Sequence, residues 1–213
     1  QYTVRNSRSD EQRDIILAAM EKADVIVIGV GLGQSPAAEA IVRTTLSRAN
    51  VPLIIDADAI NIIARDLSIL DLASVPIIMT PHLAEMARFC DLTVPEIEAD
   101  KLYHAIEVAE QNALICVLKG HETLVVDGGA DERMIYLNKS GNSGMATGGS
   151  GDVLTGVIAA LIAQGMEPFD AATLGVYIHG LAGDAAAEEL GEYSVMASDI
   201  IDHISAVIKD CRE

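Results

Sequence analysis

Short apolar runs alternate with amphipathic stretches through the first half of the chain. The apolar runs are rich in valine and isoleucine and occupy residues 24–29, 52–56, 76–80 and 114–118. Continuous runs of this kind are typical of strands buried on both faces of a parallel sheet. Between them, helical periodicity predicts helices over about residues 9–22, 35–49, 61–72 and 95–112. The alternation favours an α/β fold with a doubly wound parallel sheet and right-handed crossovers.

Local sequence signals mark where two of these helices begin. Ser9 and Gln12 resemble a capping box, in which two side chains satisfy free backbone amides reciprocally. Ser35 followed by Pro36 is typical of an N-cap and the first helical residue, because proline has no amide hydrogen to leave unpaired.

The pattern changes in the second half of the chain. Two apolar segments, residues 123–127 and 133–137, flank a Gly-Gly-Ala-Asp sequence and predict a β-hairpin. A stretch rich in Gly, Ser and Asn follows over residues 138–151. The helical pattern then returns at about residues 152–164, 168–190 and 197–209. No internal repeat and no linker divides the sequence, so we expect one domain over residues 1–213.

Polar and glycine-rich segments follow four of the predicted strands. These segments are residues 29–33, 56–58, 80–85 and 119–123. In open α/β sheets, ligands bind beyond the carboxyl ends of the strands. The four segments therefore predict one ligand site at that edge of the sheet.

The glycine-rich stretch before residue 152 is the most informative segment. Gly148, Gly149 and Gly151 allow backbone amides to approach a ligand closely, and a predicted helix starts behind them. The helix N-terminus would form an anion hole suited to phosphate, with Asp152 placed to take a proton from a hydroxyl. The alternative is that Asp152 only caps the helix and the glycines form a flexible loop.

Composition narrows the class of protein. Half of the 213 residues are hydrophobic and 22% are charged, which argues against an intrinsically disordered chain. The 14 Lys and Arg residues against 32 Asp and Glu residues leave a formal charge of −18. Because such a surface repels phosphate backbones and anionic lipids, we expect no nucleic-acid or membrane partner. An anionic ligand must then be held by local donors: helix N-termini, a lysine or a metal ion.

The cysteines bear on the cellular compartment. Cys90, Cys116 and Cys211 lie far apart and include no CxxC pair. They predict reduced thiols and hence a cytoplasmic protein. No apolar stretch reaches the roughly 18 residues of a membrane span.

Six motifs together resemble one family. They are residues 29–33 (GVGLG), 56–61 (DADAIN), 80–85 (TPHLAE), 118–123 (LKGHET), 142–152 (NSGMATGGSGD) and 179–184 (HGLAGD). In this order they resemble the ADP/ATP-dependent NAD(P)H-hydrate dehydratases of the ribokinase-like superfamily, over about residues 24–204. The resemblance implies a three-layer α/β/α fold with a mostly parallel central sheet and a C-terminal hairpin-plus-helices portion. The family's usual first strand and helix have no counterpart here, so we expect an N-terminally truncated domain that lacks an inner strand.

The resemblance assigns roles on the nucleotide side of the site. Asp152 would be the catalytic base, which activates the hydroxyl of the hydrated nicotinamide ring. The transferring phosphoryl group would be held by Gly148, Gly149, Ser150 and Gly151. The nucleotide would lie along Lys119, Gly120, His121, Glu122 and Thr123. Lys119 would contact a phosphate and Thr123 would offer a hydroxyl and an amide. The alternative for Lys119 is a solvated lysine at a strand end.

Substrate and metal roles follow in the same way. Gly31, Gly33 and His82 would contact the substrate, although a plain tight turn and a surface histidine explain them as well. Glu85 would position Mg²⁺ through water, or be an ordinary surface glutamate. Polar capping at a strand end is an equal explanation for Asp56 and Asp58, and we expect His179 and Asp184 to brace the helical layer.

The activity implied is the conversion of (S)-NADHX and (S)-NADPHX to NADH and NADPH, with ADP or ATP as co-substrate and Mg²⁺ as cofactor. The resemblance also implies a homo-oligomer and functional pairing with an NAD(P)H-hydrate epimerase. A kinase for a thiazole or pyrimidine alcohol would share Asp152 and the anion hole. The segments at residues 80–82 and 119–123 favour the dehydratase. A non-catalytic nucleotide-binding regulator is the third alternative, against which the carboxylate of Asp152 argues.

Overall fold

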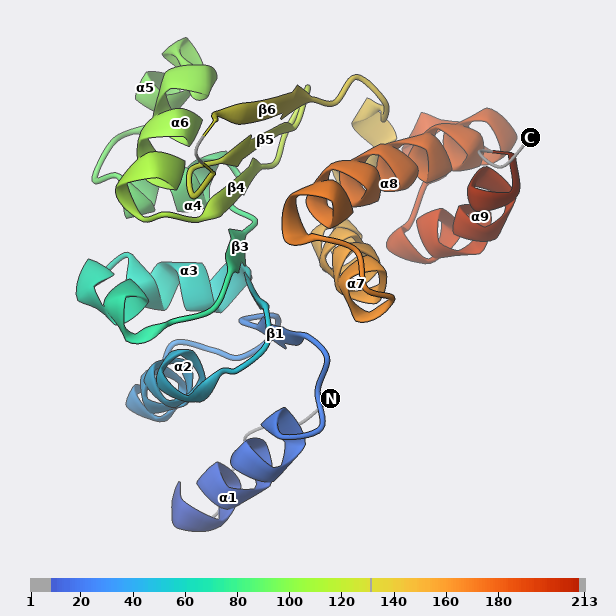
Figure 1. Ribbon diagram of the computed structural model, residues 1–213. Helices are drawn as coiled ribbons and strands as arrows, with labels where there is room; N and C mark the ends of the chain where they lie inside the picture. Colours follow the sequence, from blue (N-terminus) through green and yellow to red (C-terminus); the bar gives the residue numbers. More distant parts are fainter. Residues whose placement is uncertain (1–8, 131, 211–213) are drawn as a thin grey trace.

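Six strands form one sheet in the order in which they occur along the chain (Figure 1). The computed structural model describes residues 9–130 and 132–210. The strands are β1 (Ile26–Ile28), β2 (Leu53–Ile55), β3 (Ile77–Met79), β4 (Ile115–Leu118), β5 (Leu124–Asp127) and β6 (Met134–Leu137). Neighbours from β1 to β4 pair in parallel, and β5 and β6 pair antiparallel, which confirms the predicted hairpin.

Helices cover both faces of this sheet and make a three-layer α/β/α fold. The helices before the hairpin are α1 (Ser9–Met20), α2 (Pro36–Arg48), α3 (Ala57–Ile63), α4 (Leu83–Phe89), α5 (Val94–Ala99) and α6 (Lys101–Gln111). Those after it are α7 (Ser150–Ala163), α8 (Pro168–Leu190) and α9 (Ala197–Asp210). Short 3₁₀ helices are η1 (Leu67–Leu72), η2 (Ser143–Met145) and η3 (Glu192–Ser194). No helix among residues 9–130 and 132–210 is long and apolar enough to cross a membrane.

The inner strands β2, β3 and β4 are apolar at every position because both of their faces are buried. Leu53 and Ile55 of β2 face the core under α2, α3, α4 and α6. Ile54, between them, faces the opposite core under α7 and α8. This period of two divides each inner strand between two cores, as expected for a central parallel sheet.

The strand order corrects the doubly wound prediction. A doubly wound sheet reverses its direction of growth, whereas β1 to β6 run in sequence order. Right-handed crossovers that always step the same way place their helices on one face. Figure 1 accordingly shows α2, α3 and α6 on one side of the sheet, and α7 and α8 on the other.

Helix boundaries agree with the sequence in some places and differ in others. The Ser35 hydroxyl accepts a hydrogen bond from the Ala38 amide at 3.2 Å, which confirms the predicted cap of α2. The first helix begins at Ser9 as predicted, whereas the side chains proposed for its capping box lie outside the described residues, as does Cys211. Residues 83–89, for which no helix was predicted, form α4.

Two predicted helices are each divided in the structure. The helix expected over residues 61–72 begins earlier, at Ala57, and gives way to η1. The helix expected over residues 95–112 breaks at Asp100, which has φ −150° and ψ 72°. The Asp100 carboxylate accepts a hydrogen bond from the Tyr103 amide at 3.0 Å and so starts a new helix. Asp66 caps η1 in the same way, so capping carboxylates at Asp66 and Asp100 override the longer apolar period.

Candidate functional site

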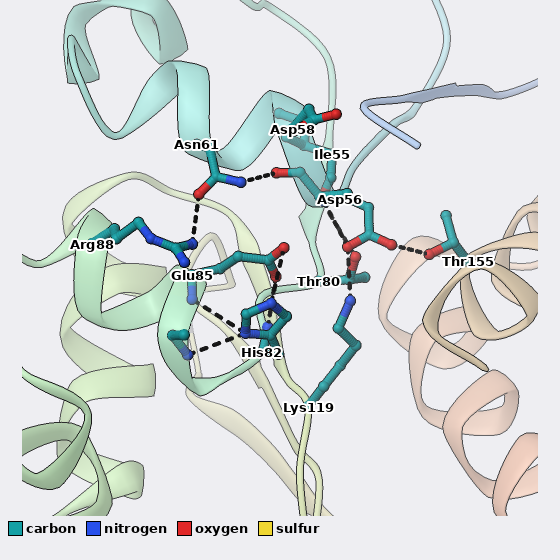
Figure 2. A network of polar contacts seen from close by, with 12 residues as sticks. Ile55, Asp56, Asp58, Asn61, Thr80, His82, Glu85, Arg88, Lys119 and Thr155 are labelled. Atoms are coloured by element: carbon teal, nitrogen blue, oxygen red, sulfur yellow. Dashed lines mark hydrogen bonds and ion pairs between the residues drawn. The ribbon is translucent and has the colours of Figure 1, made fainter. Parts of the chain in front are cut away.

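The carboxyl ends of β2, β3 and β4 meet at one edge of the sheet, as predicted, and bring distant residues together (Figure 2). Asp56 follows β2, His82 lies three residues past β3, and Lys119 follows β4. The backbone of His82 pairs with that of Lys119 in a parallel bridge, and the Lys119 amide donates to the Pro81 carbonyl at 2.8 Å. The chain therefore fixes these side chains by backbone contacts just beyond the strands.

Asp56 is the centre of a buried polar network. Its residue is only 1% exposed, and Lys119 Nζ lies 2.7 Å from Oδ1. The Thr155 hydroxyl donates to Oδ2 at 2.8 Å, and the Ala57 amide donates to Oδ1 at 2.8 Å. Asp56 caps α3, as strand-end capping predicts, but it also joins β4 and α7. Sequence reasoning missed this link, and it missed Thr155 altogether.

The glycine-rich loop leads into α7 beside the Lys119 ammonium group. Gly149 adopts φ +91°, a left-handed conformation that favours glycine, and α7 begins at the next residue. A Cβ atom on Gly151 would lie 3.2 Å from Lys119 Nζ. The free amides of a helix N-terminus and a lysine therefore converge at one point, which is the chemistry of an anion site.

Asp152 lies in the first turn of α7 with an altered proton affinity. Burial raises the pKa of its carboxyl above the ordinary value, and the negative charge of Asp56 raises it further, while Lys119 lowers it. A groove of about 490 Å³ between α7 and α9 adjoins Asp152, and Ile201, Ile204 and Ile208 line it. A carboxylate with raised pKa beside an anion site is suited to accept a proton from a hydroxyl.

Helix α8 holds the glycine-rich loop from behind. The Asp184 carboxylate accepts hydrogen bonds from the Gly141 amide at 2.8 Å and from Asn142 Nδ2 at 2.9 Å. His179 Nε2 lies 3.0 Å from the Ser150 carbonyl oxygen, where it donates. Burial lowers the pKa of His179 to about 4, so its ring is neutral. These contacts confirm the predicted bracing role of His179 and Asp184.

His82 and Glu85 cap α4 together. His82 Nδ1 accepts from the amides of Ala84 and Glu85 at 3.1 and 3.3 Å, which leaves the ring proton on Nε2. The Glu85 carboxylate accepts from the His82 amide at 2.8 Å and lies 3.3 Å from His82 Nε2. The His82 side chain is 51% exposed and that of Glu85 is 6% exposed. The histidine ring thus faces solvent at the sheet edge, while the glutamate turns inward.

The turn after β1 has open space above its glycines. Gly31 and Gly33 adopt φ +64° and +76°, and a Cβ atom on either would have no neighbour within 4 Å. The Gly33 amide donates to Asp58 Oδ2 at 2.8 Å, so Asp58 fixes the turn. Gly29 cannot be replaced, because a Cβ atom there would lie 1.7 Å from the Asp56 carbonyl oxygen. The turn is therefore packed against Asp56 at Gly29, while the space beside Gly31 and Gly33 is open.

The segment that follows Lys119 forms a tight turn of its own. Gly120 has φ +157° and Glu122 has φ +56°. Thr123 Oγ1 donates to the Gly120 carbonyl at 3.1 Å, and Lys101 Nζ donates to the His121 carbonyl at 2.8 Å. The left-handed backbone of Glu122 keeps this turn in a defined shape. It leaves the exposed His121 and Glu122 side chains at the sheet edge.

A metal site made by protein side chains alone is absent from the part of the chain that the structure describes. No group of three or more His, Cys, Asp or Glu residues is placed to hold an ion there. Glu85, predicted to position Mg²⁺ through water, stays a prediction. Both of its oxygens face His82, so an ion bound there would compete with the α4 cap.

Comparisons with known proteins identify similar chains. A family model described as NAD(P)H-hydrate dehydratase matches residues 1–206. The bifunctional NAD(P)H-hydrate repair enzyme of Moorella thermoacetica is 40% identical in an alignment of 213 residues that covers 99% of this chain and 39% of that protein. The ADP-dependent (S)-NAD(P)H-hydrate dehydratase of Neisseria meningitidis is 40% identical over 178 residues, which are 82% of this chain and 59% of that protein. The chain thus spans less than two thirds of the length of either relative.

A solved structure agrees with this result. It is that of the ADP/ATP-dependent NAD(P)H-hydrate dehydratase from Bacillus subtilis, co-crystallized with ATP and Mg²⁺. The two chains superimpose with a TM-score of 0.77 at 28% identity, over 91% of this chain and 69% of the other. The fold described above is therefore shared over almost the whole of the chain.

Proposed function

The chain belongs to the NAD(P)H-hydrate dehydratase family, and from this we propose that it dehydrates (S)-NADHX and (S)-NADPHX to NADH and NADPH, with ADP or ATP as phosphoryl donor. Its sheet, covered by helices on both faces, has the ribokinase-like fold expected from the sequence. The observation that carries the proposal is the placement of Asp152 beside a helix N-terminus and the Lys119 ammonium group. The identity of 40% to a protein named as an ADP-dependent dehydratase favours this reaction over a vitamin-precursor kinase.

The reaction needs a phosphoryl transfer followed by an elimination. Hydration of the dihydronicotinamide ring leaves a hydroxyl on the carbon next to the ring nitrogen, and hydroxide is a poor leaving group. Transfer of the terminal phosphoryl group of ADP or ATP to that oxygen makes a phosphate ester and releases AMP or ADP. The nitrogen lone pair then expels phosphate, and loss of a proton from the adjacent carbon restores the ring. Only the first step requires a catalytic group of the kinase type.

Asp152 would act in that first step. Its raised pKa makes the carboxylate a better proton acceptor than an ordinary aspartate. The amides of residues 148–151 and the Lys119 ammonium group would stabilise the charge on the phosphoryl oxygens. Lys119 would carry out this role from a fixed position, because it pairs with Asp56, whose carboxylate Thr155 in turn ties to α7.

The substrate and the nucleotide would bind at different positions along the carboxyl edge of the sheet. The exposed His82 ring and the open turn at Gly31 and Gly33 support a substrate position over β1 and β3. The turn at residues 120–123 supports a nucleotide position over β4 and β5. The Lys119 ammonium group beside Gly151 lies where the two ligands would meet.

Mg²⁺ fits this site as a partner of the nucleotide phosphates. It prefers oxygen ligands, keeps several waters and is commonly held by only one or two carboxylates together with phosphate. That preference agrees with the lack of a three-residue ligand group in the described chain. Bound there, the ion would neutralise phosphate charge. Glu85 would position the ion through water.

We also propose functional pairing with an NAD(P)H-hydrate epimerase. Several curated relatives are bifunctional repair enzymes, and this chain matches 39% of the length of the one from Moorella thermoacetica and 36% of the one from Escherichia coli. A cytoplasmic location would suit Cys116, which is buried and whose thiol has its pKa raised by burial. Homo-oligomer formation remains part of the same proposal.

An assay with Asp152→Asn tests the function. The full chain is mixed with hydrated NADH or NADPH, Mg²⁺ and ADP or ATP, and the return of dihydronicotinamide absorbance is followed. Loss of a general base should slow turnover by about 10²–10⁴-fold, while the nucleotide Kd measured by calorimetry should stay unchanged because the amides and Lys119 remain. Wild-type turnover in the variant would refute the role of Asp152. Phosphorylation of a thiazole or pyrimidine alcohol, without return of the absorbance, would favour the kinase.

A further inference from the structure

A second polar cavity lies at the same edge of the sheet, away from the anion hole. It has a volume of about 360 Å³ and is lined by Gln34, Asn61, Ala64, Arg65 and Arg88. Two of its five lining residues are arginines, in a chain that has 14 basic residues against 32 acidic ones. None of the roles assigned so far uses these arginines.

Neutral amide oxygens hold both guanidinium groups. Arg88 Nη1 donates to Asn61 Oδ1 at 2.7 Å, and Arg65 Nη2 donates to Gln34 Oε1. Among the side chains of residues 13–130 and 132–210, no carboxylate forms an ion pair with either arginine. By contrast, Arg43 pairs with Glu39 and Asp66 elsewhere on the surface. The positive charges in the cavity are therefore positioned but not neutralised.

The supports of the cavity are themselves anchored. Asn61 Nδ2 donates to the Ala57 carbonyl at 3.1 Å, which turns its oxygen toward Arg88. Gln34 Nε2 donates to Asp58 Oδ1 at 3.1 Å, which turns its oxygen toward Arg65. The second oxygen of the Asp58 carboxylate accepts a hydrogen bond from the Gly33 amide. The arrangement orients two guanidinium groups and leaves most of their N–H donors available.

The chemistry of the cavity selects an anion with several oxygens. Each guanidinium group has five N–H donors in a planar fork that matches phosphate, and one amide partner uses only one of them. Charge-assisted hydrogen bonds of this type are among the strongest that proteins form. In a chain with formal charge −18, such donors offer short-range attraction that the overall field does not.

The position of the cavity indicates which ligand supplies the phosphate. Gln34 follows Gly33 directly in the proposed substrate turn, and Arg88 lies on α4, which His82 caps. In Figure 2, Asn61 and Arg88 lie on one side of His82 and Lys119 lies on the other. Resting on the proposed function, we infer that Arg65 and Arg88 bind a phosphate group of the dinucleotide substrate, away from the reacting ring.

Binding of stable dinucleotides tests this inference without the reaction. The Kd values of NADP⁺ and NAD⁺ are measured by calorimetry on the full chain, with saturating ADP to occupy the nucleotide position. The variants are Arg65→Gln, Arg88→Gln and Arg88→Lys. Arg133→Gln is the matched control, because Arg133 pairs with Glu110 at the hairpin and outside the cavity. Thermal midpoints and circular dichroism establish that each variant folds.

Loss of either guanidinium group should weaken dinucleotide binding about tenfold or more. The Kd of ADP alone and all Kd values for Arg133→Gln should stay unchanged. Arg88→Lys keeps the charge but loses the fork, so part of the loss should remain even if Arg88→Gln fails to fold. Weaker binding of NADP⁺ alone would identify the 2′-phosphate as the bound group. Equally weaker binding of NAD⁺ would identify the diphosphate, and both results support the inference.

Two results would overturn the inference and leave the proposed function standing. One is an unchanged dinucleotide Kd in Arg65→Gln and the folded Arg88 variant, in a protein that dehydrates the hydrates. The other is an equal loss of binding in Arg133→Gln, which would mean a general effect of charge. Conversely, dinucleotide binding that depends on the arginines, in a protein without turnover, would refute the proposed function alone.

Discussion

At the scale of single residues, the buried pair of Asp56 and Lys119 shapes the whole site. Lys119 was predicted at the nucleotide phosphates from its motif, and the structure places its ammonium group 2.7 Å from a carboxylate that is almost wholly buried. One partner holds the other in place, so each has a structural role and a role in the site. A buried charge that loses its partner is more costly than the pair is stabilising.

This pair makes the effects of two substitutions non-additive. Lys119→Met keeps the length of the side chain but leaves the Asp56 carboxylate buried without its partner, which should destabilise the fold by about 3–5 kcal/mol. The double variant Asp56→Asn with Lys119→Met removes both charges and should recover much of that loss. Urea unfolding of the two single variants and the double variant measures the coupling. Nucleotide affinity should fall in both variants that lack Lys119, and additive free energies of unfolding would show that the pair is not formed.

Burial raises the pKa of Asp152 most, and the same two charges act on that pKa in opposite directions. Asp56 raises the pKa of Asp152 and Lys119 lowers it, while His179 on α8 is neutral above a pKa of about 4. Because the base must be deprotonated, turnover falls on the acid side of the Asp152 pKa. Asp56→Asn should move this acid limb to lower pH, and Lys119→Met should move it to higher pH. Profiles of kcat against pH measure both shifts, and a shift of both in the same direction would exclude this electrostatic account.

At the scale of elements, the strands were more predictable than the helices. All six strands overlap the apolar segments identified in the sequence. The signal is clearest for β2, β3 and β4, because a strand buried on both faces must be apolar throughout. The helix breaks at residues 64–66 and at Asp100 arise from capping side chains, which leave little trace in an apolar period. The sequence could indicate which loops form the site, since parallel strands end together. It could not indicate that Asp56 would reach Thr155, 99 positions away.

Helix α8 shows how a structural element serves the site without contacting a ligand. A Cβ atom on Gly180 would lie 2.1 Å from Ser140 Oγ, and one on Gly183 would lie 2.2 Å from Met145 Sδ. These glycines let the loop before α7 lie directly on α8. His179 completes the contact from the same helix through the Ser150 carbonyl. Packing of α8 therefore determines where the helix N-terminus at Ser150 points.

His179 should make the stability of this contact depend on pH. Its pKa is near 6.5 in the unfolded chain and about 4 in the fold, so the unfolded state binds more protons between these values. Stability is therefore lost as the pH falls through this window, by at most about 3 kcal/mol. His179→Gln keeps a donor for Ser150 without the titration and should flatten the slope of unfolding free energy in this window.

His203 on α9 supplies a control, because its pKa is shifted in the opposite direction. The Asp199 carbonyl and the Glu189 carboxylate raise its pKa, so its contribution is full at low pH and lost as the pH rises through the folded value. His203→Gln should therefore weaken the fold mainly at acidic pH. Identical pH profiles for His179→Gln and the wild type, from chemical unfolding at several pH values, would show that His179 is not a buried neutral ring.

At the scale of the whole molecule, ligand capture opposes the overall electrostatic field. The chain carries a formal charge of −18, and both proposed substrates are anions. The positive groups of the site are few and local: the amides at the start of α7, Lys119, and the cavity formed by Arg65 and Arg88. Repulsion at long range and attraction at short range depend differently on salt, because screening acts most strongly on charges that are far apart.

The association rate of the nucleotide should reveal this division. Raising the salt concentration from low to moderate should speed association or leave it unchanged, because ions screen the repulsive field before they weaken the short contacts. Removal of Mg²⁺ should weaken nucleotide binding and stop turnover, because unneutralised phosphates would then meet beside Asp152 and Asp56. Stopped-flow mixing with a fluorescent nucleotide, across a salt series and with or without Mg²⁺, measures both effects. A rate that falls steeply with salt would mean that a basic surface steers the nucleotide, and capture by local donors alone would then be wrong.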